Sequence, residues 1–323
     1  MNRLSRRLAR QLGIQILLLI GTLAAAELIL RIVDLRELRV GLRVGDAIVH
    51  RFHPELGWYP AANTVVERKS LIRTVTVATD SLGLRDIEHD QVARPTVLVL
   101  GDSFVWGEDV EADERFTEII RKQFPGLRIV NAGVSGYGTD QEFLLLQRLW
   151  DRFKPDVVVL IFCTENDRTD NTSNIIVGGY YKPYVIEMPD GQWRMAGQPV
   201  PMSRHVYFRE NPVVRNSWLA RAAVAGYIRF RHPRIMVPDP TEHLVAMMRD
   251  FVAERRAKFF VGIQRRIGEP LANFLETQNI PYVSFDGAEQ YHGGGDHWTP
   301  AGHRTVAERL RPLLAESALP ATH

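Results

Sequence analysis

The sequence has a single cysteine, Cys163, so the chain cannot form an intramolecular disulfide. Its formal net charge is only +2, and no block of Lys and Arg is interleaved with aromatic residues, which gives nucleic-acid binding little support. It contains neither Gly-x-Ser-x-Gly nor Gly-x-Gly-x-x-Gly, which disfavours an α/β-hydrolase nucleophile elbow and a dinucleotide site. Internal repeats and low-complexity segments are also missing. The composition, with 45% hydrophobic and 24% charged residues, is ordinary for a folded globular protein.

The longest apolar stretch lies near the N-terminus, over residues 12–33. A helix needs about 20 apolar residues to cross a bilayer core, and the only charges here, Glu27 and Arg31, are four apart and can pair on one face. Four arginines precede the stretch without acidic neighbours (Arg3, Arg6, Arg7 and Arg10). By the positive-inside rule they predict a cytoplasmic N-terminus, although three arginines on the far flank (Arg36, Arg39 and Arg43) weaken this orientation.

Two alternatives compete with a membrane anchor for this stretch. Ala24-Ala25-Ala26 fits a signal-peptidase site, but the apolar residues continue to Val33, which favours an uncleaved signal anchor over a cleaved signal. A buried helix of a soluble protein ranks third, because residues 14–26 are apolar on all faces. We therefore expect a single-pass anchor in the cytoplasmic membrane over residues 1–33, with the rest of the chain on the periplasmic or extracytoplasmic side.

The remainder of the chain predicts an α/β fold. Residues 34–94 mix turn residues with short alternating runs such as 73–77, which favours short strands. Continuous apolar runs then predict five buried strands, at residues 95–100, 127–130, 156–162, 259–263 and 281–285. Helices are expected at residues 112–123, 140–153, 216–230, 242–257 and 269–278, with a last one from Pro300, and a hairpin at 180–200. This alternation predicts a flavodoxin-like parallel sheet, in strand order 2-1-3-4-5, with helices on both faces.

The domain boundaries follow from this pattern. We expect an N-terminal β-rich extension over residues 34–94 and a catalytic domain over 95–323, with an insertion at 168–255 that could serve as a lid or specificity element. Thr139 and Glu142 are expected to form a capping box, and Thr299 to cap the last helix. The turn of the hairpin is assigned to Pro189-Asp190-Gly191.

Four short blocks each follow a predicted strand. They contain Ser103 (in Gly101-Asp102-Ser103-Phe104), Gly136 (in residues 131–136), Asn166 (in Glu165-Asn166-Asp167) and His297 (in residues 296–303). Because parallel strands end at one edge of a sheet, these residues should converge there. A serine, free backbone N–H groups, a neutral amide and a histidine are the set that acyl-ester chemistry needs.

Each block also has a plainer interpretation. The serine could be a helix cap, Gly133, Gly136 and Gly138 ordinary turn glycines, and Asn166 part of an Asn/Asp turn. Four residues near the C-terminus suggest a metal site, but the spacing matches no ordinary zinc pattern, so no metal is expected (His292, Asp296, His297 and His303). We expect His303 to pack within the last helix.

The order and content of the four blocks resemble the SGNH (GDSL-type) hydrolase superfamily, from about Pro95 to the C-terminus. The resemblance implies that Ser103 is the nucleophile and His297 the base. It also implies that the Ser103 and Gly136 N–H groups and the Asn166 amide form the oxyanion hole, without metal or cofactor.

One departure concerns the acid that orients the histidine. The superfamily usually places it three residues before the histidine, where this chain has Gly294, and the nearest acid is the adjacent Asp296. Neighbouring side chains in an extended segment point to opposite sides, so Asp296 needs a kinked backbone, which the three glycines at 293–295 could permit. We expect Asp296 as the third member; a backbone carbonyl or Asp286 is the alternative.

The N-terminal pieces add a narrower resemblance, to bacterial membrane-anchored SGNH proteins. It rests on the basic start, the anchor ending Glu-Leu-Ile-Leu-Arg, residues 81–86 and the Gly-Asp-Ser-Phe block. Trp298 is similar to a residue of envelope-polysaccharide O-acetyltransferases, in which the Asp-x-His element precedes the serine. The expected function is hydrolysis or transfer of small acyl (acetyl) esters, with envelope carbohydrate as substrate. A noncatalytic envelope carbohydrate-binding protein and a soluble flavodoxin-like ligand binder remain alternatives.

Overall fold

The computed structural model describes residues 3–39, 50–70, 72–90, 92, 94–176, 179–266, 268–292 and 296–318. Arg43 and the three glycines at 293–295 therefore lie outside the described residues. The chain forms two compact units: Met1–Leu42 with Met202–Arg234, and Arg43–Pro201 with Ile235–His323. Residues 202–234, from the middle of the expected 168–255 insertion, thus group with the N-terminal helix.

The second unit is built on a parallel five-stranded sheet. Its strands are β5 (Thr96–Gly101), β6 (Arg128–Gly133), β7 (Val157–Phe162), β10 (Lys258–Ile263) and β11 (Tyr282–Ser284). They pair in the order β11-β10-β7-β5-β6, all parallel, which confirms the predicted flavodoxin-like order. The three central strands are almost wholly buried, which is why they are continuous apolar runs without alternation.

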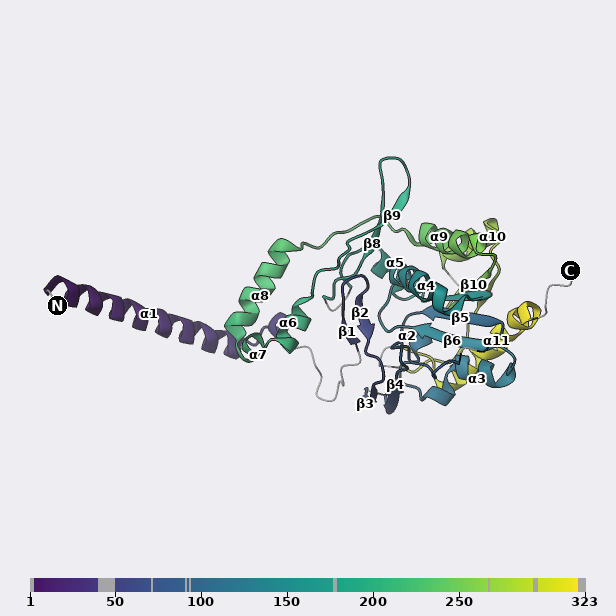
Figure 1. The fold of residues 1–323 in the computed structure, drawn as a ribbon, viewed down its shortest axis with the longest axis horizontal. Helices are drawn as coiled ribbons and strands as arrows, with labels where there is room; N and C mark the ends of the chain where they lie inside the picture. Colours follow the sequence, from purple (N-terminus) through teal and green to yellow (C-terminus); the bar gives the residue numbers. More distant parts are fainter. Residues whose placement is uncertain are drawn as a thin grey trace. The chain divides into compact units, whose positions relative to one another are not determined.

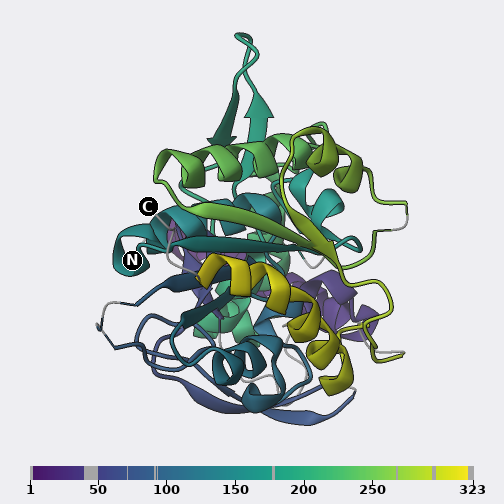
Figure 2. The ribbon, with the colours of Figure 1, turned by 90° about the vertical axis from the view of Figure 1, so that its right-hand side faces the viewer.

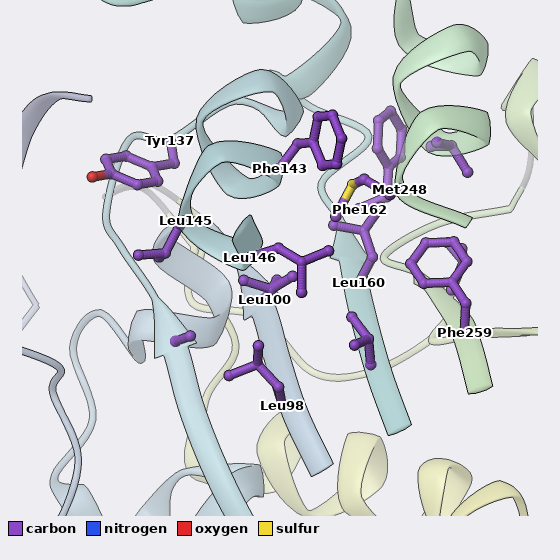
Figure 3. Packing of buried hydrophobic residues seen from close by; sticks show 14 of the residues in the cluster. Leu98, Leu100, Tyr137, Phe143, Leu145, Leu146, Leu160, Phe162, Met248 and Phe259 are labelled. Carbon is purple, nitrogen blue, oxygen red and sulfur yellow. The ribbon is translucent and has the colours of Figure 1, made fainter. Parts of the chain in front are cut away.

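Helices cover both faces of this sheet (Figure 2). One face carries α4 (Thr139–Phe153), α9 (Thr241–Glu254) and α10 (Pro270–Thr277), and the other carries α2 (Ser103–Trp106), α3 (Phe116–Gln123) and α11 (Pro300–Ala318). Alternate residues of β5 supply the two cores: Leu98 and Leu100 pack under α4, as Figure 3 shows, whereas Val97 and Val99 face α3 and α11.

The helix boundaries correct two expectations and confirm one. The helix expected from residue 112 begins at Phe116, because residues Ala112–Glu114 form a 3-10 turn (η2) and Arg115 is extended. The capping box at Thr139 and Glu142 is wrong: Gly138 caps α4, and its N–H donates to Gln141 Oε1 (3.3 Å). The cap at Thr299 is confirmed, since its hydroxyl accepts from the Gly302 N–H (3.1 Å).

The short strands before the sheet form two antiparallel pairs. β1 (His50–His53) pairs with β2 (Gly57–Pro60), and β3 (Val65–Lys69) pairs with β4 (Thr74–Ala78). The expected hairpin is also present, as β8 (Tyr184–Glu187) and β9 (Trp193–Ala196). Gly191 has φ +77° in its turn, a conformation that favours glycine.

The first unit contains α1 (Arg3–Val33), a short turn η1 (Arg36–Leu38) and the helices α6 (Arg204–Glu210), α7 (Pro212–Asn216) and α8 (Trp218–Arg231) (Figure 1). Within Arg7–Val33, α1 is long and apolar enough to cross a membrane, and its most apolar window is uncovered by the rest of the chain. Its length and composition meet the requirements of a membrane anchor or of a signal sequence.

Candidate active site

Ser103 is the first residue of α2, directly after β5. The preceding Asp102 caps the helix by accepting the Phe104 N–H (2.9 Å). Ser103 Oγ lies 2.8 Å from His297 Nε2, although 194 residues separate them in the chain. The structure thus joins the expected nucleophile and base in one hydrogen bond, the arrangement that activates a serine.

The position of α2 depends on two residues at the end of β6. A Cβ atom on Gly133 would lie 2.4 Å from the backbone nitrogen of Trp106, so only glycine permits this close approach. Asn131 Nδ2 donates to Val105 O (2.9 Å), and Asn131 Oδ1 accepts the Gly133 N–H (3.0 Å). Gly133 is therefore required for the packing of α2 against β6, and its interpretation as a turn glycine is corrected.

Gly136 and Asn166 follow the two strands that flank β5, since β5 lies between β6 and β7. Gly136 has φ +81° in a turn closed by the Tyr137 N–H and Val134 O (3.1 Å). Asn166 precedes the short helix α5 (Asp167–Asn171), and its Nδ2 donates to Asp170 Oδ2 (3.0 Å). Both residues thus stand at the carboxyl edge of the sheet with Ser103.

A tryptophan of the N-terminal extension lies beside the Gly136 turn. Trp58, on β2, donates from Nε1 to Ser135 O (3.1 Å), and its backbone oxygen accepts the Tyr137 hydroxyl (2.6 Å). A Cβ atom on Gly136 would lie 3.5 Å from the Trp58 ring. The extension therefore helps to fix this turn and bounds the space next to it.

The carboxylate nearest the imidazole is that of Asp109, which the sequence analysis missed. Asp109 Oδ2 lies 3.6 Å from His297 Nδ1, an ion-pair contact longer than an ordinary hydrogen bond. The expected Asp296 is exposed, with φ +49°, and among the described residues it makes neither a hydrogen bond nor an ion pair with His297. The alternative, Asp286, accepts instead from the Arg266 N–H (2.9 Å) and the Ser284 hydroxyl (2.6 Å).

The surroundings of Asp109 favour its ionised form. Burial by itself would raise the pKa of Asp109, but interactions with His297 and Ser70 and the charge of Arg68 bring this pKa below its ordinary value. Arg68 also pairs with Glu108. The available sequence signal was a pair of acids, Glu108 and Asp109, shortly after the Gly-Asp-Ser-Phe block.

The model of the GDSL-like lipase/acylhydrolase family matches residues 99–305. The chain belongs to this family. The matched segment contains Ser103, Gly136, Asn166 and His297, together with Asp109. Membership makes the protein an enzyme of acyl-ester hydrolysis and confirms the expected superfamily.

Solved structures resemble the chain only at low sequence identity. A lipolytic G-D-S-L family protein from Veillonella parvula is 13% identical, with 68% of this chain and 98% of that chain covered and a TM-score of 0.40. TesA is 16% identical (69% and 99% covered, TM-score 0.40), and the psychrotrophic esterase EstA from Pseudoalteromonas is 12% identical (68% and 98%, TM-score 0.37). No curated protein matches the chain. The family assignment therefore rests on the match to the family model.

Three carboxyl groups that interact with one another, among them Asp102 next to Ser103, are buried: Asp102, Glu142 and Asp167, each at most 1% exposed. Burial raises the pKa of all three, and the charge of Asp102 raises those of Glu142 and Asp167 further. Among the described residues, neither oxygen of Glu142 has a hydrogen-bond partner, which disfavours its charged form further. In contrast to Glu142 and Asp167, Asp109 is therefore suited to serve as the charged acid at the histidine.

Two aromatic residues of the last block belong to the core. The ring of His303 accepts the Phe116 N–H at Nδ1 (3.3 Å), and burial, with the charges of Arg115 and Arg85, lowers its pKa to about 3. Trp298 is 1% exposed and packs against Phe104. Among the residues that the structure describes, no three His, Cys, Asp or Glu side chains are grouped as metal ligands.

Proposed function

We propose that the protein is a serine esterase or O-acyltransferase in which Ser103 is the nucleophile, His297 the general base and Asp109 the acid that orients the ring. The observation that carries the proposal is the 2.8 Å contact between Ser103 Oγ and His297 Nε2. The carboxylate of Asp109, 3.6 Å from the other ring nitrogen, supports the same assignment.

In the proposed reaction, Ser103 Oγ attacks the ester carbonyl while His297 Nε2 accepts the hydroxyl proton. The tetrahedral intermediate then collapses, the alcohol leaves with that proton, and an acyl-serine remains. Water or a sugar hydroxyl attacks the acyl-serine next and loses its proton to His297. The bond between the acyl carbon and Ser103 Oγ then breaks, and Oγ takes the proton from His297, which regenerates both residues. Water makes the reaction a hydrolysis, and a sugar hydroxyl makes it an acyl transfer.

For the oxyanion we propose three donors: the backbone N–H groups of Ser103 and Gly136 and the side-chain amide of Asn166. The strand order supports this set, because the residues follow three adjacent strands. Each such donor is worth about 10²- to 10³-fold in rate in a comparable hydrolase. Asn166 is held by Asp170, which fixes one of its two amide protons and leaves the other for the oxyanion.

We further propose that the acyl group is small, with acetyl the first choice. Trp58 and Ile176 are the side chains nearest to a Cβ atom placed on Gly136, at 3.5 and 3.8 Å, and they bound the space beside the proposed oxyanion hole. The acceptor or leaving group is proposed to be an envelope carbohydrate, because α1 suits an anchor in the cytoplasmic membrane. In this proposal the catalytic unit lies on the extracytoplasmic side.

The test uses the full-length protein purified in detergent. We expect hydrolysis of p-nitrophenyl acetate, labelling by a fluorophosphonate probe, and loss of both in Ser103→Ala. Hydrolysis should decline from acetyl to octanoyl esters. Transfer of labelled acetyl to an oligosaccharide acceptor would identify a transferase. A folded wild type that neither turns over ester nor reacts with the probe would contradict the proposal and favour the noncatalytic carbohydrate-binding alternative.

A further inference from the structure

Helix α8 carries an exposed apolar stripe that packing within the chain does not explain. The stripe consists of Ala223, Gly226, Tyr227 and Phe230, whose spacing places them on one face of the helix. Phe230 is 84% exposed and Tyr227 60% exposed. The opposite face holds the buried Arg221 and Ile228. A helix face turned to water is normally polar, so this one is suited to another environment.

Basic residues accompany the α8 stripe. Arg229 and Arg231, both exposed, flank it on its two sides. The segment 202–234 contains seven arginines and a single acidic residue, Glu210. Large aromatic residues with flanking arginines on one helix are typical of helices that lie in a membrane interface.

The start of α8 is fixed to the end of the apolar helix α1, in the same compact unit. The Glu27 carboxylate accepts hydrogen bonds from the Ser217 hydroxyl (2.9 Å), the Trp218 N–H (3.0 Å) and the Leu219 N–H (2.8 Å). Arg31 donates to Asn216 O (2.8 Å). Glu27 lies about 9 Å along the helix from the end of α1, at a rise of about 1.5 Å per residue, so α8 starts near the level where a membrane-spanning α1 would leave the bilayer core.

The direction of α8 relative to α1 is compatible with a helix that lies at the membrane surface. In Figure 1, α8 leaves the end of α1 steeply instead of running alongside it. Its buried face packs on Phe208 of α6 and Val214 of α7, and α6 lies in the view on the side away from the length of α1. The α8 stripe lies on the opposite face of the helix from these contacts.

We propose that α8 is an interfacial helix whose stripe rests in the bilayer that α1 crosses, with Arg229 and Arg231 binding the phosphates of anionic lipids. The proposal needs α1 to remain attached as an anchor. It is independent of the catalytic assignment, since none of its residues belongs to the site of Ser103 and His297.

The test measures the depth of Phe230 in reconstituted full-length protein. Phe230→Cys carries a nitroxide label, and Val65→Cys, at another exposed apolar residue (72% exposed, on β3), is the matched control. Wild-type protein reports background labelling at the buried Cys163. We expect the ratio of oxygen to nickel-complex accessibility to be severalfold higher at position 230 than at 65, and to rise further when phosphatidylglycerol is added to phosphatidylcholine vesicles.

Three outcomes would overturn the proposal. Equal accessibility ratios at the two positions would place the stripe in water. Spin–spin broadening at 230 that disappears on dilution with unlabelled protein would place a second copy over it. Recovery of the mature protein from cells without α1 would show that α1 is cleaved and that no anchor holds α8 at the bilayer. For the arginines, Arg229→Gln with Arg231→Gln should abolish the response to phosphatidylglycerol, and an unchanged response would refute their role.

Discussion

The replacement Asp109→Asn tests the assignment that distinguishes this site from its superfamily. When His297 takes the serine proton, its ring becomes positive 3.6 Å from the Asp109 carboxylate. At an effective dielectric constant of about 20, two unit charges at this distance attract by roughly 4.6 kcal/mol. Since each 1.36 kcal/mol is about tenfold in rate, the full attraction corresponds to about three orders of magnitude. We expect kcat/KM to fall about 10²- to 10³-fold, because the neutral amide and nearby water recover part of it.

The matched control is Asp296→Asn, which removes a carboxylate from the neighbour of His297 in sequence. Asp296 is exposed and makes no described contact with the imidazole, so this change should leave kcat/KM within a factor of about two, as surface substitutions usually do. The assay is p-nitrophenyl acetate hydrolysis by detergent-solubilised full-length protein. Asparagine tolerates the φ of +62° at position 109, so the unfolding temperature of Asp109→Asn should stay close to that of the wild type. Thermal unfolding checks this.

Loss of activity in Asp296→Asn together with full activity in Asp109→Asn would refute the assignment of Asp109 as the acid. Loss in both variants would mean that both carboxylates act on the ring, a shared role that the 3.6 Å contact alone does not predict. If Asp109→Asn lowers both kcat/KM and the unfolding temperature, the loss of activity would be attributed to a disturbed loop and not to the missing charge.

Three other substitutions probe the support of the site. Gly133→Ala should cost about 1–3 kcal/mol in unfolding free energy and reduce kcat, because its Cβ would meet the Trp106 backbone at 2.4 Å and displace α2. The pKa of Glu142 is raised in the folded state, so the stability that its protonated form contributes is complete below a pH of about 4.5 and is lost as the pH rises. Glu142→Gln should therefore make the decline of the unfolding temperature from pH 5 to 8 shallower. An unchanged slope would contradict this prediction. Lys182→Met breaks a buried ion pair with Asp140 and should cost about 3–5 kcal/mol at pH 7. That cost should shrink at pH 5, since burial raises the pKa of Asp140 to about 6 even with Lys182 present, and urea unfolding at both pH values measures it.

The sheet could be predicted from the sequence because its strands are buried on both faces. Runs such as Val157–Phe162 have no polar side and no competing helical pattern, so their type and approximate limits could be predicted from the apolar runs. Their order was predicted from the flavodoxin-like fold that the strand–helix alternation indicates. The missed helix boundaries have tertiary causes. Arg115 ends the short turn before α3 because its buried guanidinium reaches the Arg85 backbone oxygen, a partner 30 residues away that no local signal shows.

In the candidate site too, some residues could be predicted from the sequence and one could not. Ser103 could be found because its block directly follows β5, and His297 because its block lies between the last strand, β11, and the last helix, α11, where strand ends converge by topology. Asp109 could not be selected by spacing, since its approach to the imidazole depends on a left-handed backbone conformation in the loop after α2. Gly294 at the usual position of the acid indicates that the carboxylate beside His297 comes from another segment. The adjacent Asp296 makes no described contact with the imidazole.

An acid carried by the loop after α2 links the proposed catalytic group to the N-terminal extension. In the superfamily pattern the acid and the histidine share one segment, whereas here Arg68 and Ser70, on or beside β3, face the loop of Asp109. The same loop contacts the glycine turn, because Glu108 accepts the Ser135 hydroxyl (2.6 Å) and pairs with Arg68. Residues 50–78 therefore support both the proposed acid and the proposed oxyanion turn. The smallest active fragment should include this extension as well as the 99–305 family segment.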